Sequence, residues 1–161
     1  MKKLPLRQWL RFAFGLGLAV LVAIQIVPYG HASAPAGFTR DIHWNSPRTE
    51  ELVRRACYDC HSNETRRSWY SRVAPISWVV QSNVERGRAH LNFSEWDQVQ
   101  PHIFDAASKL IAGEMPPYSY RLFHPEARLS VEEEEELIDG IFSTMGIRRV
   151  IRYDDLLGKN E

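Results

Sequence analysis

The sequence predicts an all-α domain that follows a single N-terminal membrane helix. An uncharged apolar run occupies residues 12–27. In later segments apolar residues recur at three- and four-residue spacing, as they do on one face of a helix. No stretch of useful length shows the apolar and polar alternation of a half-buried strand. With 161 residues, the chain has room for one domain and one appended segment.

The apolar run is typical of an export signal or a membrane anchor. Basic residues and no acidic ones precede it, and Pro28 and Gly30 follow it. A helix from Trp9 to Pro28 would reach roughly 30 Å, enough to cross a bilayer. Cleavage after Ala34 is disfavoured because Pro35 comes next. We therefore expect residues 1–30 to be an uncleaved signal anchor or transmembrane segment.

The charge distribution predicts the orientation of this segment. Because the basic residues lie before the apolar run, the N-terminus should stay in the cytoplasm and the remainder should be exported. This predicts a single-pass membrane protein whose soluble domain is exported. The exported remainder carries 16 basic and 20 acidic residues, since four of the 20 basic residues (Lys2, Lys3, Arg7 and Arg11) precede it. We expect no nucleic-acid partner, because that balance offers no basic face.

The exported part divides into three segments by composition. Residues 31–45 lack a regular apolar period and contain Pro35 and Gly37, which suits an extended linker. Residues 46–146 are predicted to form one domain, and residues 147–161 a polar C-terminal tail.

The first helix of the domain is predicted to begin at Pro47. Ser46 has the side chain of an N-cap, and proline is favoured at the first helical position. Glu50 near this end suits the helix dipole. The helix should run to about Ala56 and deliver the chain directly into Cys57.

Two further helices are expected in the middle of the domain. One begins at Pro75 and ends at Gly87, with an apolar pattern made by Ile76, Val79, Val80 and Val84. The other covers about 94–112 and ends at Gly113, and Pro101 could split it in two.

The last helix is expected over about 131–145. Ser130 and Glu133 form a capping box at its start. The acidic run from Glu132 to Glu136 is read as a solvated helix start that the dipole favours. The apolar stripe of this helix is Leu137, Ile138, Ile141, Phe142 and Met145.

The segment Cys57-Tyr-Asp-Cys60-His61 has the spacing of covalent haem attachment. Two cysteines three positions apart on a helical turn point the same way, so both sulfurs can reach the vinyl groups along one porphyrin edge. The histidine that follows can then reach the iron. We therefore predict one covalent haem c, with Cys57, Cys60 and His61 as its attachment and ligand residues.

Two other interpretations of this segment stay open. A dithiol redox site usually accompanies a βαβ pattern and a low-pKa thiol at a helix start, whereas this motif follows a helix. A structural zinc site would need a fourth ligand. His90, His102 or His124 could supply it, but none belongs to a paired motif.

Met115 is the predicted second axial ligand of the iron. It lies in Gly113-Glu-Met115-Pro-Pro117, where two prolines hold the loop extended. The plainer interpretation is a loop methionine that fills a gap in the core. Met145, on the apolar stripe of the last helix, is expected in the core. His90, His102 or His124 would instead give bis-imidazole iron.

Aromatic and basic residues between the ligand segments could line the haem. A porphyrin needs apolar walls, and its propionates suit guanidinium or indole N–H groups. The candidate wall residues are Trp69, Tyr70, Trp78, Phe93, Trp96, Tyr118 and Tyr120. The candidate propionate partners are Arg66, Arg72, Arg88 and Trp96.

Read together, these segments resemble the bacterial haem-binding domain family, a group of c-type cytochrome-like proteins with an N-terminal hydrophobic segment. The resemblance implies covalent haem c, with His61 as proximal ligand and Met115 as distal ligand. One departure is Arg67-Ser68, where the family commonly has a tryptophan and a proline. The matching strings are Gln25-Ile-Val-Pro-Tyr-Gly30, Cys57-Tyr-Asp-Cys-His-Ser-Asn-Glu-Thr65, Trp69-Tyr-Ser71, Leu91-Asn-Phe-Ser94, Gly113-Glu-Met-Pro-Pro117 and His124-Pro-Glu-Ala127.

The resulting prediction is a small cytochrome c-like helical domain around one haem, in which the first helix crosses the last. Its expected function is one-electron transfer at the periplasmic face of a bacterial inner membrane, rather than catalysis. The sequence does not identify the redox partner proteins. The alternative is a haem-based redox or gas sensor, or a peroxidase-like protein, in which a small molecule replaces Met115 at the iron.

Overall fold

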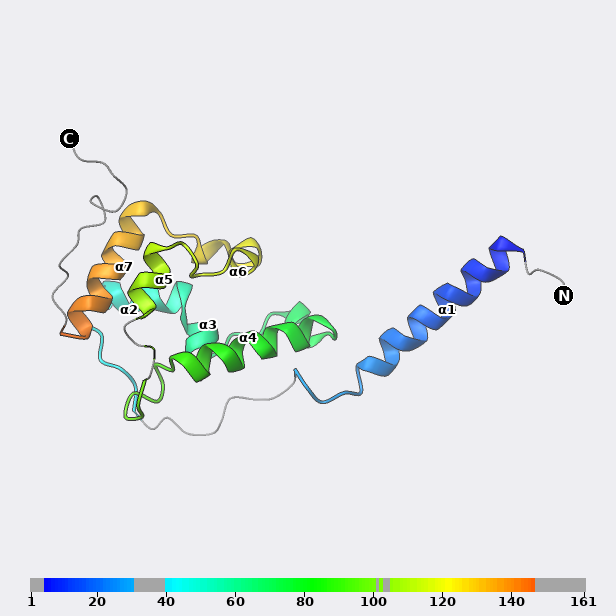
Figure 1. Cartoon of the computed structure of the whole chain (residues 1–161), viewed down its shortest axis with the longest axis horizontal. Coiled ribbons are helices and arrows are strands. Elements are labelled where there is room, and N and C mark those ends of the chain that lie inside the picture. The colour runs from blue at the N-terminus through cyan, green and yellow to red at the C-terminus, as the bar shows by residue number, and fades with distance from the viewer. Residues whose placement is uncertain (1–4, 31–39, 101, 103–104, 147–161) are drawn as a thin grey trace. The chain divides into compact units, whose positions relative to one another are not determined.

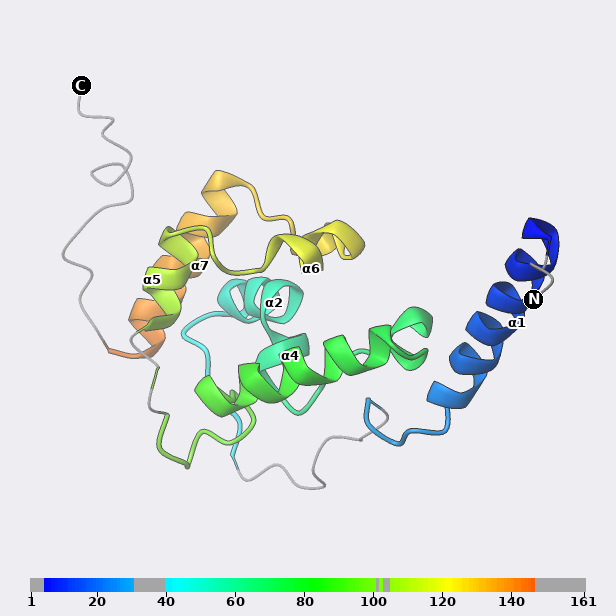
Figure 2. The same cartoon turned by 45° about the vertical axis from the view of Figure 1, so that its right-hand side comes forward.

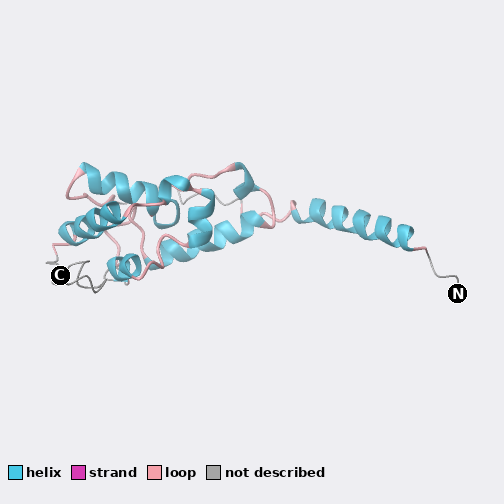
Figure 3. Ribbon diagram, turned by 90° about the horizontal axis from the view of Figure 1, so that it is seen from above, coloured by secondary structure: helices cyan, strands magenta, loops and turns pink. Residues whose placement is uncertain are grey.

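The computed structural model describes residues 5–30, 40–100, 102 and 105–146. These residues form helices and no strand (Figure 3), so the all-α prediction is confirmed. Most of the predicted linker and the whole C-terminal tail lie outside the described residues. The α-helices are labelled in Figure 1, and two short 3-10 helices are named η1 and η2. In chain order the elements are α1 (Leu6–Ile24), α2 (Pro47–Ala56), α3 (Tyr58–His61), η1 (Trp69–Arg72), α4 (Ile76–His90), α5 (Asp105–Ile111), α6 (Tyr118–Phe123), η2 (Pro125–Ala127) and α7 (Val131–Thr144).

The chain divides into two compact units, which are described separately. The anchor unit contains residues 1–33 and 66–83, and the core unit contains residues 34–65 and 84–161. The core unit therefore holds the whole Cys57–His61 motif and the Met115 loop.

Helix α1 covers most of the predicted apolar run. It has 19 residues and none of them is buried. It is long and apolar enough to cross a membrane, and no other helix in the described ranges is. At about 1.5 Å per residue its length is roughly 28 Å, close to the thickness of a bilayer core.

Helix α2 begins and ends where its local sequence predicts. The Ser46 hydroxyl accepts a hydrogen bond from the Thr49 N–H at 3.1 Å, and Pro47 is the first helical residue. The helix ends at Ala56, and the backbone of Cys57 leaves the helical region with φ −124°. The chain therefore changes direction at the first cysteine of the motif.

Helices α2 and α7 pack against each other at a glycine. A Cβ on Gly140 would lie 2.2 Å from the Thr49 hydroxyl oxygen, so the two helices can approach this closely only without a side chain at position 140. The predicted capping box of α7 is confirmed, since Ser130 and Glu133 each bond the other's backbone N–H. Figure 2 shows α5 beside α7, with which it is also in contact.

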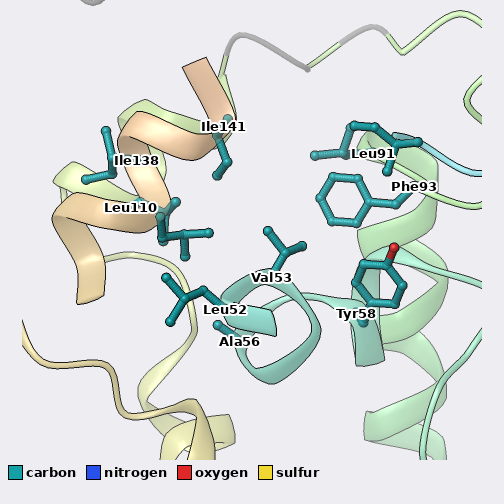
Figure 4. Packing of buried hydrophobic residues seen from close by; sticks show 11 residues of the cluster. Leu52, Val53, Ala56, Tyr58, Leu91, Phe93, Leu110, Ile138 and Ile141 are labelled. Atoms are coloured by element: carbon teal, nitrogen blue, oxygen red, sulfur yellow. The ribbon is translucent and has the colours of Figure 1, made fainter. Parts of the chain in front are cut away.

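The hydrophobic core of the core unit lies between α2, α5 and α7 and extends to the segment after α4. Leu52, Leu137 and Ile138 are fully buried. Each such side chain contributes roughly 1.5–3 kcal/mol by leaving water. In Figure 4, Phe93 lies beside Tyr58, and their rings are stacked with centroids 5.7 Å apart. The full cluster is Ile42, Leu52, Val53, Ala56, Tyr58, Leu91, Phe93, Leu110, Leu137, Ile138 and Ile141.

Ion pairs join α2 and α7 at the edge of this core. Arg55 donates to both carboxylate oxygens of Glu133, at 2.7 and 3.1 Å, and Arg48 donates to the same side chain at 3.1 Å. The hydrogen bond from Arg55 is the main reason why the pKa of Glu133 falls to about 2. The ion pair with Arg55 therefore keeps the Glu133 carboxylate ionised at pH values well below its usual pKa.

Two predicted helix boundaries are wrong. Helix α4 continues through Gly87 to His90, so this glycine does not end it. In the described part of 94–112, only Asp105–Ile111 is α-helical. Turns and a bend occupy most of residues 94–98 instead, and side chains bond the backbone in this region: Gln100 accepts from the Asn92 N–H and donates to the Glu95 carbonyl.

Candidate functional site

The residues of the attachment motif lie on a single helical turn. Cys57 ends α2, and α3 then runs from Tyr58 to His61. The N–H groups of Cys60 and His61 both donate to the Cys57 carbonyl, at 3.1 and 3.0 Å. Both cysteines are free thiols and partly exposed. One turn of backbone therefore presents two sulfurs and an imidazole together.

The environment of the two thiols differs from that of a reactive dithiol. Burial raises the pKa of Cys57 to about 12, and burial with the nearby Asp59 raises the pKa of Cys60 to about 11. Both thiols therefore stay protonated at neutral pH. Disulfide-exchange motifs depend on a thiolate that forms near neutrality, so these pKa values disfavour the dithiol interpretation.

A backbone carbonyl orients the imidazole of His61. Its Nδ1 lies 3.0 Å from the carbonyl oxygen of Leu91. Because a carbonyl can only accept, Nδ1 must carry the proton and Nε2 keeps its lone pair. Burial also lowers the pKa of His61, which favours the neutral ring. Hydrogen bonds to the backbone of Leu91 and Gly87 oppose this lowering of the pKa. A neutral imidazole whose second nitrogen carries no proton is the form that binds iron.

The chain after His61 is fixed by the segment Leu91–Ser94. The Phe93 N–H donates to the His61 carbonyl at 2.7 Å, and the Ser94 hydroxyl accepts from the Asn63 N–H at 3.1 Å. The Asn92 amide donates to the Asn63 side chain at 3.1 Å. Two strings that the sequence related only by family resemblance therefore form one hydrogen-bonded structure around the predicted iron ligand.

Gly87 brings α4 against the turn formed by Cys57–His61, which we call the attachment turn. A Cβ at this position would lie 2.4 Å from the Cys60 carbonyl oxygen and 3.0 Å from its carbon. The next residue, Arg88, donates to the Ser62 carbonyl at 2.9 Å and to the Thr65 hydroxyl at 3.0 Å. Sequence reasoning missed the role of Gly87, because a glycine inside a helical pattern has the same appearance as a helix stop.

Met115 lies in a loop whose path begins at Gly113. As predicted, Gly113 follows the end of α5, and its φ of 67° is left-handed. The N–H groups of Glu114 and Met115 both donate to the Lys109 carbonyl, at 3.0 and 3.2 Å. The Met115 side chain is 37% exposed. Met115 is therefore a partly exposed residue and does not belong to the buried core cluster.

A hydrogen bond connects the helix after this loop to the attachment motif. The Tyr120 hydroxyl, on α6, donates to the carboxylate of Asp59 at 2.6 Å. Asp59 is buried between the two cysteines of the motif. Since Met115 is five residues from Tyr120, at most about 18 Å of extended chain separates them. The structure thus joins α6, the helix after the Met115 loop, to Cys57–His61 by a contact that the sequence does not predict.

The residues of α6 fit an apolar group that carries carboxylates. This helix has no buried residue, and it exposes Tyr118, Leu122 and Phe123. The Nε of Arg121 is buried and has no hydrogen-bond partner. A porphyrin would cover the apolar side chains, and a propionate would satisfy the guanidinium. Arg121 was missing from the predicted propionate partners.

The remaining predicted residues have other surroundings. Met145 packs against the core cluster, as expected for a core methionine. Trp69 and Tyr118 are 80% and 75% exposed. Arg66 and Arg72 belong to the anchor unit. Other candidates have local contacts: His90 with the Arg86 carbonyl, His102 with Asp105, His124 with Glu126 and the Tyr120 ring, and Trp96 with the core cluster.

No three His, Cys, Asp or Glu side chains of the described residues form a group that could hold a metal ion by themselves. The zinc interpretation therefore gains no support. A haem iron differs, because the porphyrin supplies four of its ligands and the protein only the axial ones.

Comparison with known proteins identifies the family. The model of a family described as a haem-binding domain matches residues 19–143 of the 161. No curated protein and no solved structure matches the chain. The family match covers α2 to α6, both cysteines, His61 and Met115, and it reaches from within α1 to within α7. The chain therefore belongs to the haem-binding domain family.

Proposed function

We propose that this chain binds one haem c covalently through Cys57 and Cys60 and transfers single electrons. His61 and Met115 would be the two axial ligands of the iron. The observation that best supports this is the imidazole of His61: its Nδ1 is occupied by the Leu91 carbonyl at 3.0 Å, and two protonated thiols share its helical turn. That is the arrangement a covalently held porphyrin needs.

The contribution of the protein would be to hold and tune the cofactor. Haem supplies a reversible one-electron change at iron. The Leu91 carbonyl fixes the ring of His61 and makes its Nε2 more electron-rich. Met115 offers an uncharged thioether, which favours a higher potential than a second imidazole would. Arg121 would hold a propionate, and the exposed apolar side chains of α6 would shield the ring edge.

The proposed location is the periplasmic face of a bacterial inner membrane. Helix α1 supplies the single pass, and its preceding basic residues favour a cytoplasmic N-terminus. The redox partners would then be proteins in or near the same membrane.

Met115→Ala tests the ligand assignment. The purified full chain should keep its covalent haem, because Cys57 and Cys60 are intact. It should lose the methionine-to-iron charge-transfer band at the red end of the visible spectrum. Met145→Leu is the matched control and should keep that band. Persistence of the band in Met115→Ala would refute the assignment, and a colourless wild type from cells that mature cytochromes c would refute haem binding by this chain.

A haem-based sensor or peroxidase-like protein is the second candidate, and one observation favours it. Met115 is 37% exposed and sits on a loop, so a small molecule could displace it. Rapid carbon monoxide binding to reduced wild type, at the rate of Met115→Ala, would favour this candidate. Slow binding by wild type alone would favour electron transfer.

A further inference from the structure

The anchor unit has an inverted distribution of polar and apolar side chains. Within residues 66–83, Ser71, Ser77 and Gln81 are buried, with exposures of 3%, 0% and 4%. Four large apolar side chains of the same segment are exposed, whereas Trp78 and Val80 are half-buried. Trp69 is 80% exposed, Val73 45%, Ile76 48% and Val79 61%. We call these four residues the interfacial surface.

The first turns of α4 show the inversion most clearly. Ser77 and Gln81 are four residues apart and share one helix face. Gly30 packs against Ser77 so closely that a Cβ would lie 2.7 Å from its hydroxyl oxygen, and Arg67 donates to the Gln81 side chain. Ile76 and Val79 are left exposed. A helix at the surface of a water-soluble protein has the opposite arrangement, with its apolar face inside.

This segment is hydrogen-bonded directly to the end of α1. Gln25 follows the last residue of that helix, and its side chain makes two bonds with the backbone of Ala74. It accepts from the Ala74 N–H at 3.0 Å and donates to the Ala74 carbonyl at 3.1 Å. Arg67 also donates to the Gly30 carbonyl at 2.9 Å. The interfacial surface therefore belongs to the same structure as the C-terminal end of α1.

The position of that end determines what surrounds the segment. A helix of about 28 Å that crosses a hydrocarbon core of about 30 Å ends at the boundary with the headgroups. A segment bonded to this end lies at the same depth. Tryptophan is enriched at this depth, where its ring meets both apolar and polar surroundings. Residues 66–83 also carry three arginines (Arg66, Arg67 and Arg72) and no acidic residue, which suits anionic phospholipid.

We infer that Trp69, Val73, Ile76 and Val79 insert into the headgroup region of the bilayer, and that phospholipid is what covers them. This rests on the proposed membrane anchoring by α1. Residues 66–83 are then a second, interfacial membrane contact, and the anchor continues into the exported part of the chain. Exposed apolar surface that would be unfavourable in water is stabilised there.

Photo-crosslinking from single positions tests this inference. Benzoylphenylalanine replaces Val79, or separately Ile76, in the full chain, which is placed in nanodiscs of phosphatidylethanolamine and phosphatidylglycerol. After illumination, mass spectrometry identifies the adducts. Ser143, exposed on α7 of the core unit, is the negative control position. Leu18, within α1, is the positive control position.

We expect phospholipid adducts at positions 79 and 76 at a yield within about twofold of position 18, and at least tenfold fewer at position 143. Adducts only to the haem or to the chain itself at both 76 and 79, with lipid adducts at 18, would overturn the inference and leave the anchor intact. Absence of lipid adducts at 18 would overturn the anchor too. The haem absorption spectrum of each variant reports separately on haem binding.

Discussion

At the scale of single residues, the candidate site depends on close contacts with the attachment turn. The Leu91 carbonyl selects the tautomer of His61, and Gly87 gives α4 the room to approach the Cys60 carbonyl. Neither residue carries chemistry that would attract notice in a sequence. Both act through backbone atoms, so their importance depends on position rather than residue type.

Gly87→Ala should destabilise the protein, although alanine is the better helix former by roughly 1 kcal/mol. The added methyl would meet backbone atoms of Cys60, which cannot rotate away. We expect a loss of roughly 1–3 kcal/mol in the free energy of unfolding and less haem-loaded protein. Denaturant titration and a haem stain measure the two effects. Ala89→Ser, at an exposed position of the same helix, is the control, and equal stability of both variants would contradict the close approach.

Tyr120→Phe should weaken the connection between α6 and the attachment motif. It removes the hydroxyl that donates to the buried carboxylate of Asp59 at 2.6 Å. A lost hydrogen bond to a charged group costs roughly 1.5–3 kcal/mol. We also expect the methionine charge-transfer band to disappear at a lower temperature than in wild type. Tyr118→Phe, at an exposed position of α6, should change neither property. An unchanged band in Tyr120→Phe would exclude a role for Tyr120 in positioning the Met115 loop.

At the scale of elements, α2 and α7 form the framework that carries the attachment motif. Their caps are local and were predicted from Ser46, Pro47, Ser130 and Glu133. Their packing depends on Gly140 against Thr49 and on the ion pairs of Glu133 with Arg48 and Arg55. Since α2 runs directly into Cys57, any loosening of this helix pair reaches the attachment turn.

The pairing of Glu133 predicts how stability depends on pH. The pKa of Glu133 is about 2 in the folded state and about 4.5 without its partners. A lowered folded-state pKa means that the stabilising effect is present above pH 4.5 and is lost as the pH falls towards 2. The difference in unfolding free energy between wild type and Glu133→Gln should therefore shrink over this range. Glu135→Gln is the control, and a constant difference for Glu133→Gln would count against the ion pair.

At the scale of the whole molecule, the N-terminal segment is part of the folded structure and more than a tether. Gln25 and Gly30 are bonded to residues 66–83 within the anchor unit. The sequence predicted a boundary at residue 30 from composition. Contacts of this segment with a distant part of the chain could not be predicted, because composition carries no information about partners forty residues away.

The intact mass of the membrane-extracted protein should equal that of the uncleaved chain plus one haem. Retention of the segment is favoured because cleavage after Ala34 would remove Gln25 and Gly30 from their hydrogen-bond partners, and Pro35 is unsuited to follow a cleaved bond. Mass spectrometry of the denatured protein shows at once whether the N-terminal segment is retained and whether the haem is covalently bound. A mass that lacks the first 34 residues would show cleavage, and a haem that dissociates on denaturation would show that it is not covalently bound.

The sequence by itself determined the features that depend on neighbouring residues. These are the helical class, the ends of α2 and α7, and the apolar N-terminal helix. The haem-binding family was identified by resemblance across strings that include Cys57–Thr65 and Gly113–Pro117. Helix caps and periodic patterns act within a few residues, so they can be read in order along the chain. The assignment of iron ligands to His61 and Met115 stays a prediction.

Tertiary structure alone decided what depends on distant partners. It made Gly87 a point of close packing instead of a helix end, and within the described residues it limited the helix expected over 94–112 to Asp105–Ile111. It placed the Leu91 carbonyl at His61 and Tyr120 at Asp59. It also buried the polar face of the first turns of α4. The physical reason is that close approach and hydrogen bonding between residues far apart in the chain, such as Gly87 with Cys60, His61 with Leu91 and Asp59 with Tyr120, depend on how the helices pack. Local propensity determines only that they are helices.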